Sequence, residues 1–438
     1  MRVFCIKFKL IYRVHLTSKE YGGLCYNIFM DYIQLLISSF KNLFYISSDL
    51  AVFWAPIVFG FFFWKVWVHY IRTDYLANIK WVMLEVHLPK EIYKPPQVME
   101  FVLVALDQAR SGSFYEKWWV GLVPPWFSLE IVSIGGNVRF FIRAQLFYKN
   151  IIESRIYSQF PEVELSEAPD YANISPPGEG HDVSLFGVEF KLTEPDPLPI
   201  KTYVDYEMNK GYMDEKQRFD PMTPMLEFLG SIGPDEQVWV QILVQAHKKR
   251  YKKENGGIGD WRDEGKDFIK KLTQGEKKKL KEGEKPEKPQ LTKAQNDNIA
   301  AIERNMSKVG FDCGIRAIYM AKPGKFNIGH IPNLTGMFKQ FNSSGLNGFK
   351  TANGTGFNRP WEEVDKWLGI HRLGLVRRKF FDAYRRRSYF YPPYKRKPFV
   401  LSVEELATIF HFPSAIAETP TLERIESKKS EPPANLPV

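Results

Sequence analysis

The residues of this chain that are best suited to chemistry are cations, and they gather in one segment near its C-terminal end. Residues 370–397 contain ten Lys and Arg and a single acidic residue, Asp382. The cations are Arg372, Arg377, Arg378, Lys379, Arg385, Arg386, Arg387, Lys395, Arg396 and Lys397. Aromatic residues are interleaved with them, namely Phe381, Tyr384, Tyr389 and Tyr391.

This composition has three interpretations. Cations that neutralise phosphates, beside rings that stack on unpaired bases, are typical of a surface that binds nucleic acid. The same cations would be attracted to an anionic membrane surface or to a protein partner. The third interpretation is structural, because helical spacing places Leu373, Val376 and Phe380 on one side that could pack on the protein's own core. The interleaved aromatic residues favour nucleic acid slightly.

The sequence contains none of the common catalytic motifs. No Gly-x-x-x-x-Gly-Lys-Ser/Thr loop is present to cradle a triphosphate. No His-x-x-x-His pair would place two metal ligands on one helix face, and no Gly-x-Ser-x-Gly elbow presents a nucleophile. The acidic pairs Glu362-Glu363 and Glu404-Glu405 fall at expected helix starts, where they favour the positive end of the helix dipole. We therefore expect no catalytic residue, no metal and no cofactor.

A run of apolar residues, 50–71, predicts how the protein is held in place. As a helix it would extend about 33 Å, enough to cross a hydrocarbon core of about 30 Å. The alternative is a helix buried in a protein core. Amphipathic rings and cations near the ends of the run would sit at the headgroups. These predicted membrane anchors are Trp54, Trp64, Lys65, Trp67, Tyr70 and Arg72.

The charges that flank this run predict its orientation. One basic residue, Lys41, lies between residues 31 and 50, against three between residues 72 and 91. The positive-inside rule then places the C-terminal domains in the cytoplasm, on a single-pass protein of the inner, cytoplasmic membrane. Residues 1–49 form a leader without a signal-peptide core and an amphipathic segment that we expect at the interface. A more coherent segment opens at Met30, so we expect part of this leader to be a mis-assigned start.

The composition is that of a folded protein from a reducing compartment. The chain has 438 residues, 44% of them hydrophobic and 15% aromatic, which is enough for two or three domains with packed cores. Its net charge is +10. Cys5, Cys25 and Cys313 cannot make a disulfide framework or a Cys-rich metal site.

After the apolar run, the hydrophobic patterns predict an α+β fold of tandem ferredoxin-like modules. In residues 78–172 the expected order is β-α-β-β-α-β. Its strands are expected at 80–88, 127–134, 138–144 and 163–165, and its helices at 97–109 and 149–160. Gly135 and Gly136 predict a hairpin between the two middle strands, because glycine adopts positive φ without strain.

A related order recurs in residues 180–341. Strands are expected at 183–192, 200–206, 237–246 and 312–321, and helices at 221–232 and 292–309. A charged insert, 248–290, has the composition of a solvated and partly disordered excursion. The remaining parts are a flexible loop at 342–358, the basic helical segment at 359–397 and a C-terminal segment at 398–438.

The C-terminal segment carries a resemblance to a known family. Residues 399–413 read FVLSVEELATIFHFP, and 419–425 and 431–437 follow with TPTLERI and EPPANLP. Together with 127–143 and 159–164, these phrases resemble the membrane-linked accessory region, itself of unknown function, that precedes the motor domain of bacterial ATPases related to conjugative and type IV secretion DNA-transfer proteins. The family's phosphate loop has no counterpart here.

The resemblance implies a non-catalytic, membrane-anchored component of a DNA-translocation or type IV secretion-like assembly that docks a separately encoded motor ATPase. The expected docking residues are Glu404, Glu405, Leu406, Phe410, His411 and Phe412. The alternative is a structural membrane protein whose cytoplasmic domains bind protein or lipid and never nucleic acid. Both hypotheses leave self-association open.

Overall fold

The computed structural model describes most of the chain. The described residues are 30–42, 45, 49–89, 94–110, 112–176, 178–179, 182–209, 219–253, 256–274, 291–356, 367, 372–413 and 424–425. The predicted leader before residue 30, the second part of the charged insert, the Glu362-Glu363 pair and the C-terminal phrases at 419–423 and 431–437 lie outside them. The chain divides into two compact units, Met1–Ile71 and Arg72–Val438.

The predicted apolar helix is present. Residues 30–42 are helical, and α3 runs from Ala51 to Ala77. Among the described residues, α3 is the one helix long and apolar enough to cross a membrane, and only 6% of its most apolar stretch is buried. A helix in a protein core would be largely buried, so this exposure argues against that alternative.

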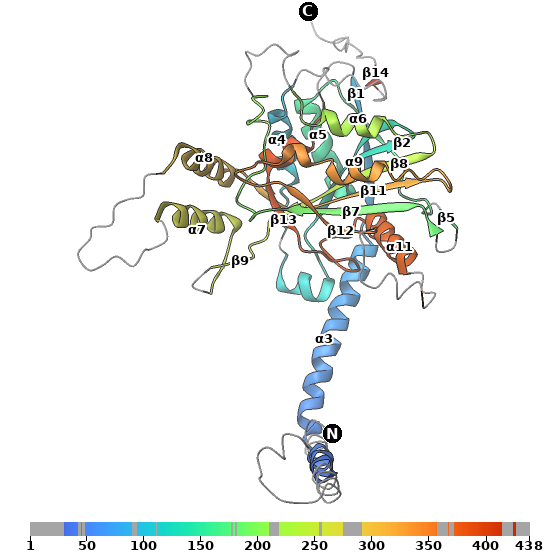
Figure 1. The fold of residues 1–438 in the computed structure, drawn as a ribbon, viewed down its shortest axis with the longest axis vertical. Helices are drawn as coiled ribbons and strands as arrows, with labels where there is room; N and C mark the ends of the chain where they lie inside the picture. The colour runs from blue at the N-terminus through green and yellow to red at the C-terminus, as the bar shows by residue number, and fades with distance from the viewer. Residues whose placement is uncertain are drawn as a thin grey trace, which may run out of the picture. The chain divides into compact units, whose positions relative to one another are not determined.

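One large antiparallel sheet organises residues 72–438 (Figure 1). Its described strands follow the order β12-β7-β11-β8-β2-β3-β1, with β4 and the parallel β14 paired to β1 and β13 paired to β11. The strands are β1 (Trp81–Pro89), β2 (Trp126–Ile134), β3 (Asn137–Gln145), β4 (Glu164–Glu167), β7 (Leu185–Leu192), β8 (Glu236–Ala246), β11 (Gly310–Ala321), β12 (Phe349–Gly354), β13 (Phe399–Ser402) and β14 (Arg424–Ile425).

The two predicted modules share this sheet. Strand β2 of the first pairs with β8 of the second along its whole length, from Trp126 opposite Gln245 to Ile134 opposite Gln237. The mixed α+β prediction is therefore confirmed, and both halves belong to one compact unit. Gly135 and Gly136 form the predicted hairpin with φ of 61° and 89°.

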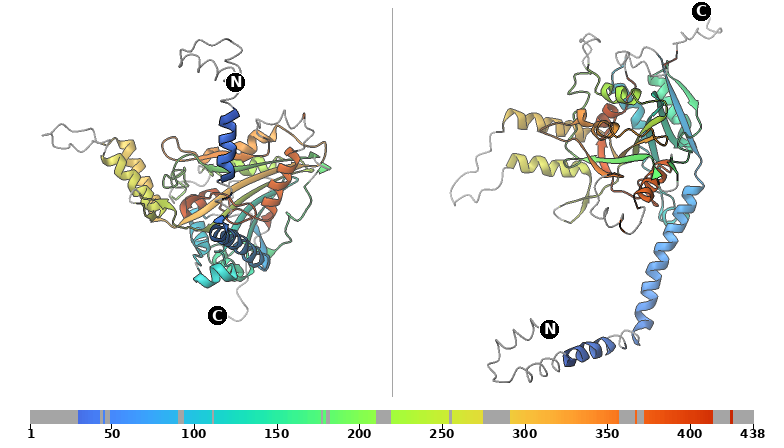
Figure 2. Two further views of the ribbon diagram at one scale, coloured as in Figure 1. Left: turned by 90° about the horizontal axis from the view of Figure 1, so that it is seen from below. Right: turned by 45° about the vertical axis from the view of Figure 1, so that its right-hand side comes forward.

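Five described helices cover one face of the sheet, and α11 packs on the other (Figures 1 and 2). The first face carries α4 (Gln97–Leu103), α5 (Lys149–Gln159), α6 (Thr223–Gly230), α9 (His330–Gly336) and α12 (Val403–Ile409), whose apolar side chains join the main core. Helix α11 (Arg372–Arg385) packs on the opposite face through a second core cluster. Because both faces are covered, β8 and β11 are buried almost throughout.

Two local predictions were wrong, and the charged insert contains elements that the sequence did not predict. Within the charged insert, β9 (Tyr251–Lys252) pairs with β10 (Ile258–Gly259), and α7 (Trp261–Gln274) lies beside α8 (Lys293–Ser307) (Figure 1). The strand expected at 200–206 is absent, because residues 203–209 form turns. The loop expected at 342–358 contributes β12 to the sheet. Strand β12 forms because it pairs with the distant strand β7, whereas the turns at 203–209 are closed by hydrogen bonds between near neighbours.

Candidate functional site

A row of polar side chains crosses the face of the sheet on which α11 lies. Glu189 of β7 stands opposite Arg316 of β11, Arg316 opposite Gln241 of β8, and Gln241 opposite Glu130 of β2. None of the four is more than 5% exposed. Buried polar groups are costly unless they are hydrogen-bonded, so the segment that covers this row must also supply partners.

The C-terminal part of the basic segment supplies these partners. Residues 384–396 lie across the row and contact each member in turn. The contacts are Gln241 Nε2 to the Tyr384 carbonyl at 3.3 Å, Arg316 Nη2 to the Ser388 carbonyl at 2.7 Å, Arg387 Nε to Glu130 at 2.9 Å and Arg396 Nε to Glu189 at 3.3 Å. Residues 384–396 of the predicted binding segment therefore have a structural role, and we call them the clamp.

Arg387 is the centre of that clamp. It forms a two-bond ion pair with Glu130, at 2.9 and 3.0 Å, and a second pair with Asp170 at 2.6 Å. The side chains of Arg387 and Glu130 are both 0% exposed. Burial by itself raises the pKa of Glu130. Arg387 and hydrogen bonds from Ser128 and Tyr171 outweigh burial, and together they lower this pKa from its ordinary value of 4.5 to about 2. The prediction that Arg387 binds nucleic acid or an anionic surface was wrong, because its charge is already paired in the core.

Most of the interleaved aromatic residues are also core residues. Phe381, Tyr384 and Tyr389 are at most 4% exposed. The first two pack on the ring of Trp239, with centroids 5.9 and 5.5 Å apart. The Tyr389 ring lies so close to Gly314 that a Cβ there would stand 2.4 Å from it. These three rings cannot stack on unpaired bases, which corrects their predicted role.

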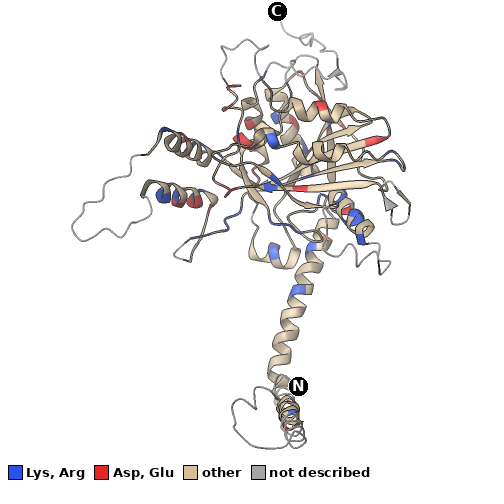
Figure 3. Cartoon of the chain, viewed as in Figure 1, with Lys and Arg blue, Asp and Glu red and all other residues tan. Residues whose placement is uncertain are grey.

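The other predicted cations remain near the surface, and Figure 3 shows Lys and Arg in blue along α11. Arg377 and Arg385 are half-buried. Arg385 and Arg386 both pair with Asp382, at 3.0 and 2.8 Å. The exposed residues are Arg372, Arg378, Lys379, Arg386, Lys395, Arg396 and Lys397. The structure thus brings part of the predicted cationic site to one exposed helix face.

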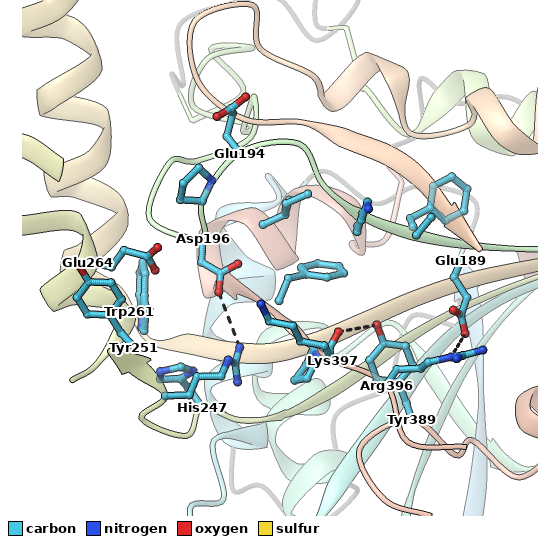
Figure 4. Close-up of a pocket in the computed structure, with 18 of the residues that line it drawn as sticks. Glu189, Glu194, Asp196, His247, Tyr251, Trp261, Glu264, Tyr389, Arg396 and Lys397 are labelled. Carbon is cyan, nitrogen blue, oxygen red and sulfur yellow. Dashed lines mark hydrogen bonds and ion pairs between the residues drawn. The ribbon is translucent and has the colours of Figure 1, made fainter. Parts of the chain in front are cut away.

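Arg396 and Lys397 line a pocket of about 580 Å³ (Figure 4). Two of its cations face carboxylates, since Arg396 pairs with Glu189, and Arg250 pairs with Asp312 at 2.6 Å. His247 Nδ1 lies 2.6 Å from Asp312 as well. The pocket can hold a small polar ligand, but its matched charges offer little attraction to a polyanion. The described residues contain no group of three that could hold a metal ion.

Two carboxyl groups in this pocket have perturbed acidity. Burial raises the pKa of Asp196, and burial together with the nearby Asp196 raises the pKa of Glu264. Such shifts in a cleft occur at functional sites and also in structural ion-pair networks. Asp196 lies 3.8 Å from Arg250, which belongs to such a network.

The residues expected to dock a motor ATPase are buried. Glu404, Glu405, Leu406, Phe410, His411 and Phe412 are each at most 3% exposed. Ser402 caps α12 in a capping box with Glu405, as the acidic residues at a helix start predicted. Burial raises the pKa of Glu405 to about 7. These side chains form core and not a docking surface, because β13 pairs with β11 and α12 packs on α4.

The predicted membrane anchors all lie on α3. Trp54, Trp64, Lys65 and Tyr70 are exposed, and Trp67 and Arg72 are partly buried. Sequence reasoning missed a further aromatic group at 114–120, where the short helix η2 (Glu116–Val120) is found. Its signal was the unusual density of rings in FYEKWWV, in a segment to which no element was assigned.

A comparison with protein families assigns this fold to a family. Residues 80–424 match the model of a family described as a domain of unknown function, DUF8128. No curated protein matches the chain. The matched range is well over half of the chain and runs from the start of β1 through α12 to the first residue of β14. The chain therefore belongs to the DUF8128 family.

Proposed function

We propose that this protein is a non-catalytic, single-pass protein of the cytoplasmic membrane whose folded domain acts as a scaffold on the cytoplasmic side. The observation that carries the proposal is α3, a 27-residue helix with an apolar stretch that is hardly buried. A helix of this length spans a bilayer core at about 1.5 Å per residue. The excess of basic residues after the helix supports the cytoplasmic location of the domain.

The anchoring can be tested by extraction. Alkaline carbonate should leave the full chain in the membrane pellet. Changing Phe59, Phe62 and Val66 to Asp should release it, since each carboxylate costs about 2.5–3.5 kcal/mol at the centre of a membrane helix. The matched control is Phe147→Asp, because Phe147 is 78% exposed outside α3. Release of the unaltered chain by carbonate would contradict the proposal.

The orientation can be tested with reporter fusions. A reporter fused after Asp74 should report the cytoplasm, and one fused after Met30 should report the opposite side. The reason is the three-to-one excess of basic residues on the C-terminal flank. Cytoplasmic signals from both fusions would mean that the helix does not cross the membrane once.

DNA translocation is a second candidate function, and the exposed face of α11 favours it. Arg378, Lys379 and Arg386 are exposed on this helix and its end. The resemblance to accessory regions of DNA-transfer ATPases points in the same direction. A motor ATPase, if it is a partner, would have to bind elsewhere than at 399–413, because that segment is core.

This candidate predicts salt-dependent DNA binding. Changing Arg378, Lys379 and Arg386 to Gln should reduce the log–log salt slope by about 0.7–0.9 for each lost phosphate contact. Arg387 is left intact because it holds the core together. A matched triple change at Lys266, Lys270 and Lys293, which are exposed on α7 and α8, should leave the slope unchanged. If the unaltered chain did not retain DNA, DNA translocation would be ruled out as its function.

We further infer that the sheet consists of two ferredoxin-like modules joined edge to edge. The spatial order β4-β1-β3-β2 supports this for the first module, in which α4 connects β1 to β2 and α5 connects β3 to β4 along the chain. The order β12-β7-β11-β8, with α6 and α9 between strands, supports it for the second. In that module α7 and α8 stand where the first has its two-glycine hairpin. The second strands, β2 and β8, join the modules.

A further inference from the structure

An exposed aromatic segment lies in the folded domain at residues 114–120. Phe114 is 70% exposed, Tyr115 65% and Trp119 51%, and Val120 adds further apolar surface. They stand on a short helical stretch that ends at Gly121, whose φ is 77°. Large rings gathered on a surface mark an interaction site, because single exposed apolar residues are common but groups of them are not.

The segment lies beside Arg72, the first residue of the folded unit that follows the apolar run. The guanidinium of Arg72 stands 5.6 Å from the centre of the Trp118 ring. Arg72 is covalently bonded to Ile71, the last residue of the apolar run, and consecutive Cα atoms are about 3.8 Å apart. A bilayer crossed by residues 50–71 therefore has its headgroup layer at the level of Trp118. Trp and Tyr rings are enriched in that layer.

Cations gather at the same place. Lys248 Nζ donates to the Tyr391 hydroxyl at 2.9 Å and lies 5.1 Å above that ring. Tyr391 packs on the same core cluster as Tyr75 and Leu76, which lie in the last turn of α3. Lys395 is exposed close by.

Lys248 lies within electrostatic reach of three further cations. Partial burial lowers its pKa to about 8, helped by the positive charges of Lys395, Arg72 and Arg250 and opposed by Asp312. Arg250 already pairs with Asp312 at 2.6 Å. An anion beside Lys248, Lys395 and Arg72 would relieve the repulsion between these three cations. Lipid phosphates provide such an anion at the headgroup layer.

The acidic residue of the segment does not oppose this arrangement. Glu116 is held by the Ser113 backbone amide at 2.7 Å and faces Arg110 at 3.9 Å. Its charge is thus engaged within the domain, which leaves the neighbouring rings as the exposed part of the segment.

We propose that residues 114–120 are a second membrane contact, which lies in the headgroup layer of the bilayer that α3 crosses, with Arg72, Lys248 and Lys395 binding lipid phosphates beside it. The inference rests on the membrane anchoring proposed above. One helix alone leaves a domain free to rotate about its axis, whereas a second contact fixes which surface faces the membrane.

Depth-dependent quenching tests this contact in the full chain. Cys5 and Cys25 are changed to Ser, and Cys313 is buried and can stay. An environment-sensitive fluorophore is then attached to Tyr115→Cys in the chain reconstituted into vesicles of phosphatidylcholine and phosphatidylglycerol. We expect a blue-shifted emission that is quenched by lipids with a nitroxide at the headgroup. The same label at Ile328→Cys, which is 73% exposed elsewhere in the domain, should not be quenched.

A label in α3 separates failure of this inference from failure of the anchoring proposal. A fluorophore at Phe59→Cys, 70% exposed on α3, should be quenched by nitroxides placed deep in the acyl chains. Quenching at residue 59 without quenching at residue 115 would overturn the second contact and leave the anchor standing. Quenching at neither position would overturn both.

The cations have their own readout. Changing Lys248 and Lys395 to Gln should reduce quenching at residue 115 to the level found in vesicles of phosphatidylcholine alone. An unchanged emission from the label at residue 328 would show that the variant is folded. The phosphate-binding part of the proposal would be wrong if quenching at residue 115 were the same with and without phosphatidylglycerol and the same with and without these substitutions.

Discussion

Replacing Arg387 with Gln should lower the free energy of unfolding of the folded domain by about 3–5 kcal/mol. The substitution leaves the Glu130 carboxylate 0% exposed and without the guanidinium that now binds both of its oxygens. Breaking a buried pair in this way costs more than the pair contributes, because an uncompensated charge remains in the core. Arg387 also has φ of 50°, and a backbone of this kind persists only where surrounding contacts hold it.

Chemical denaturation of the detergent-solubilised chain, followed by tryptophan fluorescence, measures this loss. The control is Arg386→Gln, whose side chain is 56% exposed and pairs with Asp382. It should cost no more than about 1 kcal/mol. The double variant E130Q/R387Q should regain much of the stability, because the fully buried Glu130 charge is then gone and Asp170, the other partner of Arg387, is 31% exposed to solvent. Equal losses for the Arg386 and Arg387 variants would contradict the clamp.

The same pair predicts a dependence on pH. The pKa of Glu130 is about 2 in the folded protein, against an ordinary value of 4.5. Ionised Glu130 therefore contributes its full stabilisation above about pH 4.5, and this contribution is lost as the pH falls from 4.5 toward 2. The double variant E130Q/R387Q should show a smaller loss of stability over this range than the unaltered chain.

The second large effect is expected at Phe410. Phe410→Ala should cost about 3–5 kcal/mol, because the side chain is fully buried and packs edge-to-face on Phe140 with centroids 6.0 Å apart. Phe147→Ala, at a ring that is 78% exposed, should change stability by no more than about 0.5 kcal/mol.

This comparison also decides between core and docking surface. Truncating a docking residue would weaken partner binding and leave the free energy of unfolding unchanged. Truncating a core residue lowers the free energy of unfolding. If Phe410→Ala had the same thermal and chemical stability as the unaltered chain, residues 399–413 would have to lie on the surface. That result would contradict the burial of Phe410 in the structure.

Local pattern was sufficient for much of the fold. The apolar run predicted α3, and alternating and helical spacing predicted the four strands and two α-helices of the first module in their order. Glycine at positive φ explains the hairpin at Gly135 and Gly136. Ser402 and Glu405 lie three residues apart, so their capping box depends on near neighbours alone. For the hairpin and the capping box, the deciding contacts lie within a few residues along the chain.

Pairing between distant residues decided the rest. The second module was predicted with an extra strand at 200–206 and without β12, because a strand forms only where a partner edge accepts it. The charged composition of the insert concealed α7, which is stabilised by packing beside α8. The aromatic segment at 114–120 had no pattern of its own and gained meaning from its contact with Arg72.

The candidate site shows this division most sharply. The sequence by itself determined that cations and rings gather at 370–397, since composition is a local property. Only the tertiary structure decided that Arg386 is exposed while Arg387, its neighbour, is buried. The physical reason is that a buried charge needs an opposite charge beside it, and Glu130, which provides that charge, lies 257 positions away in the chain.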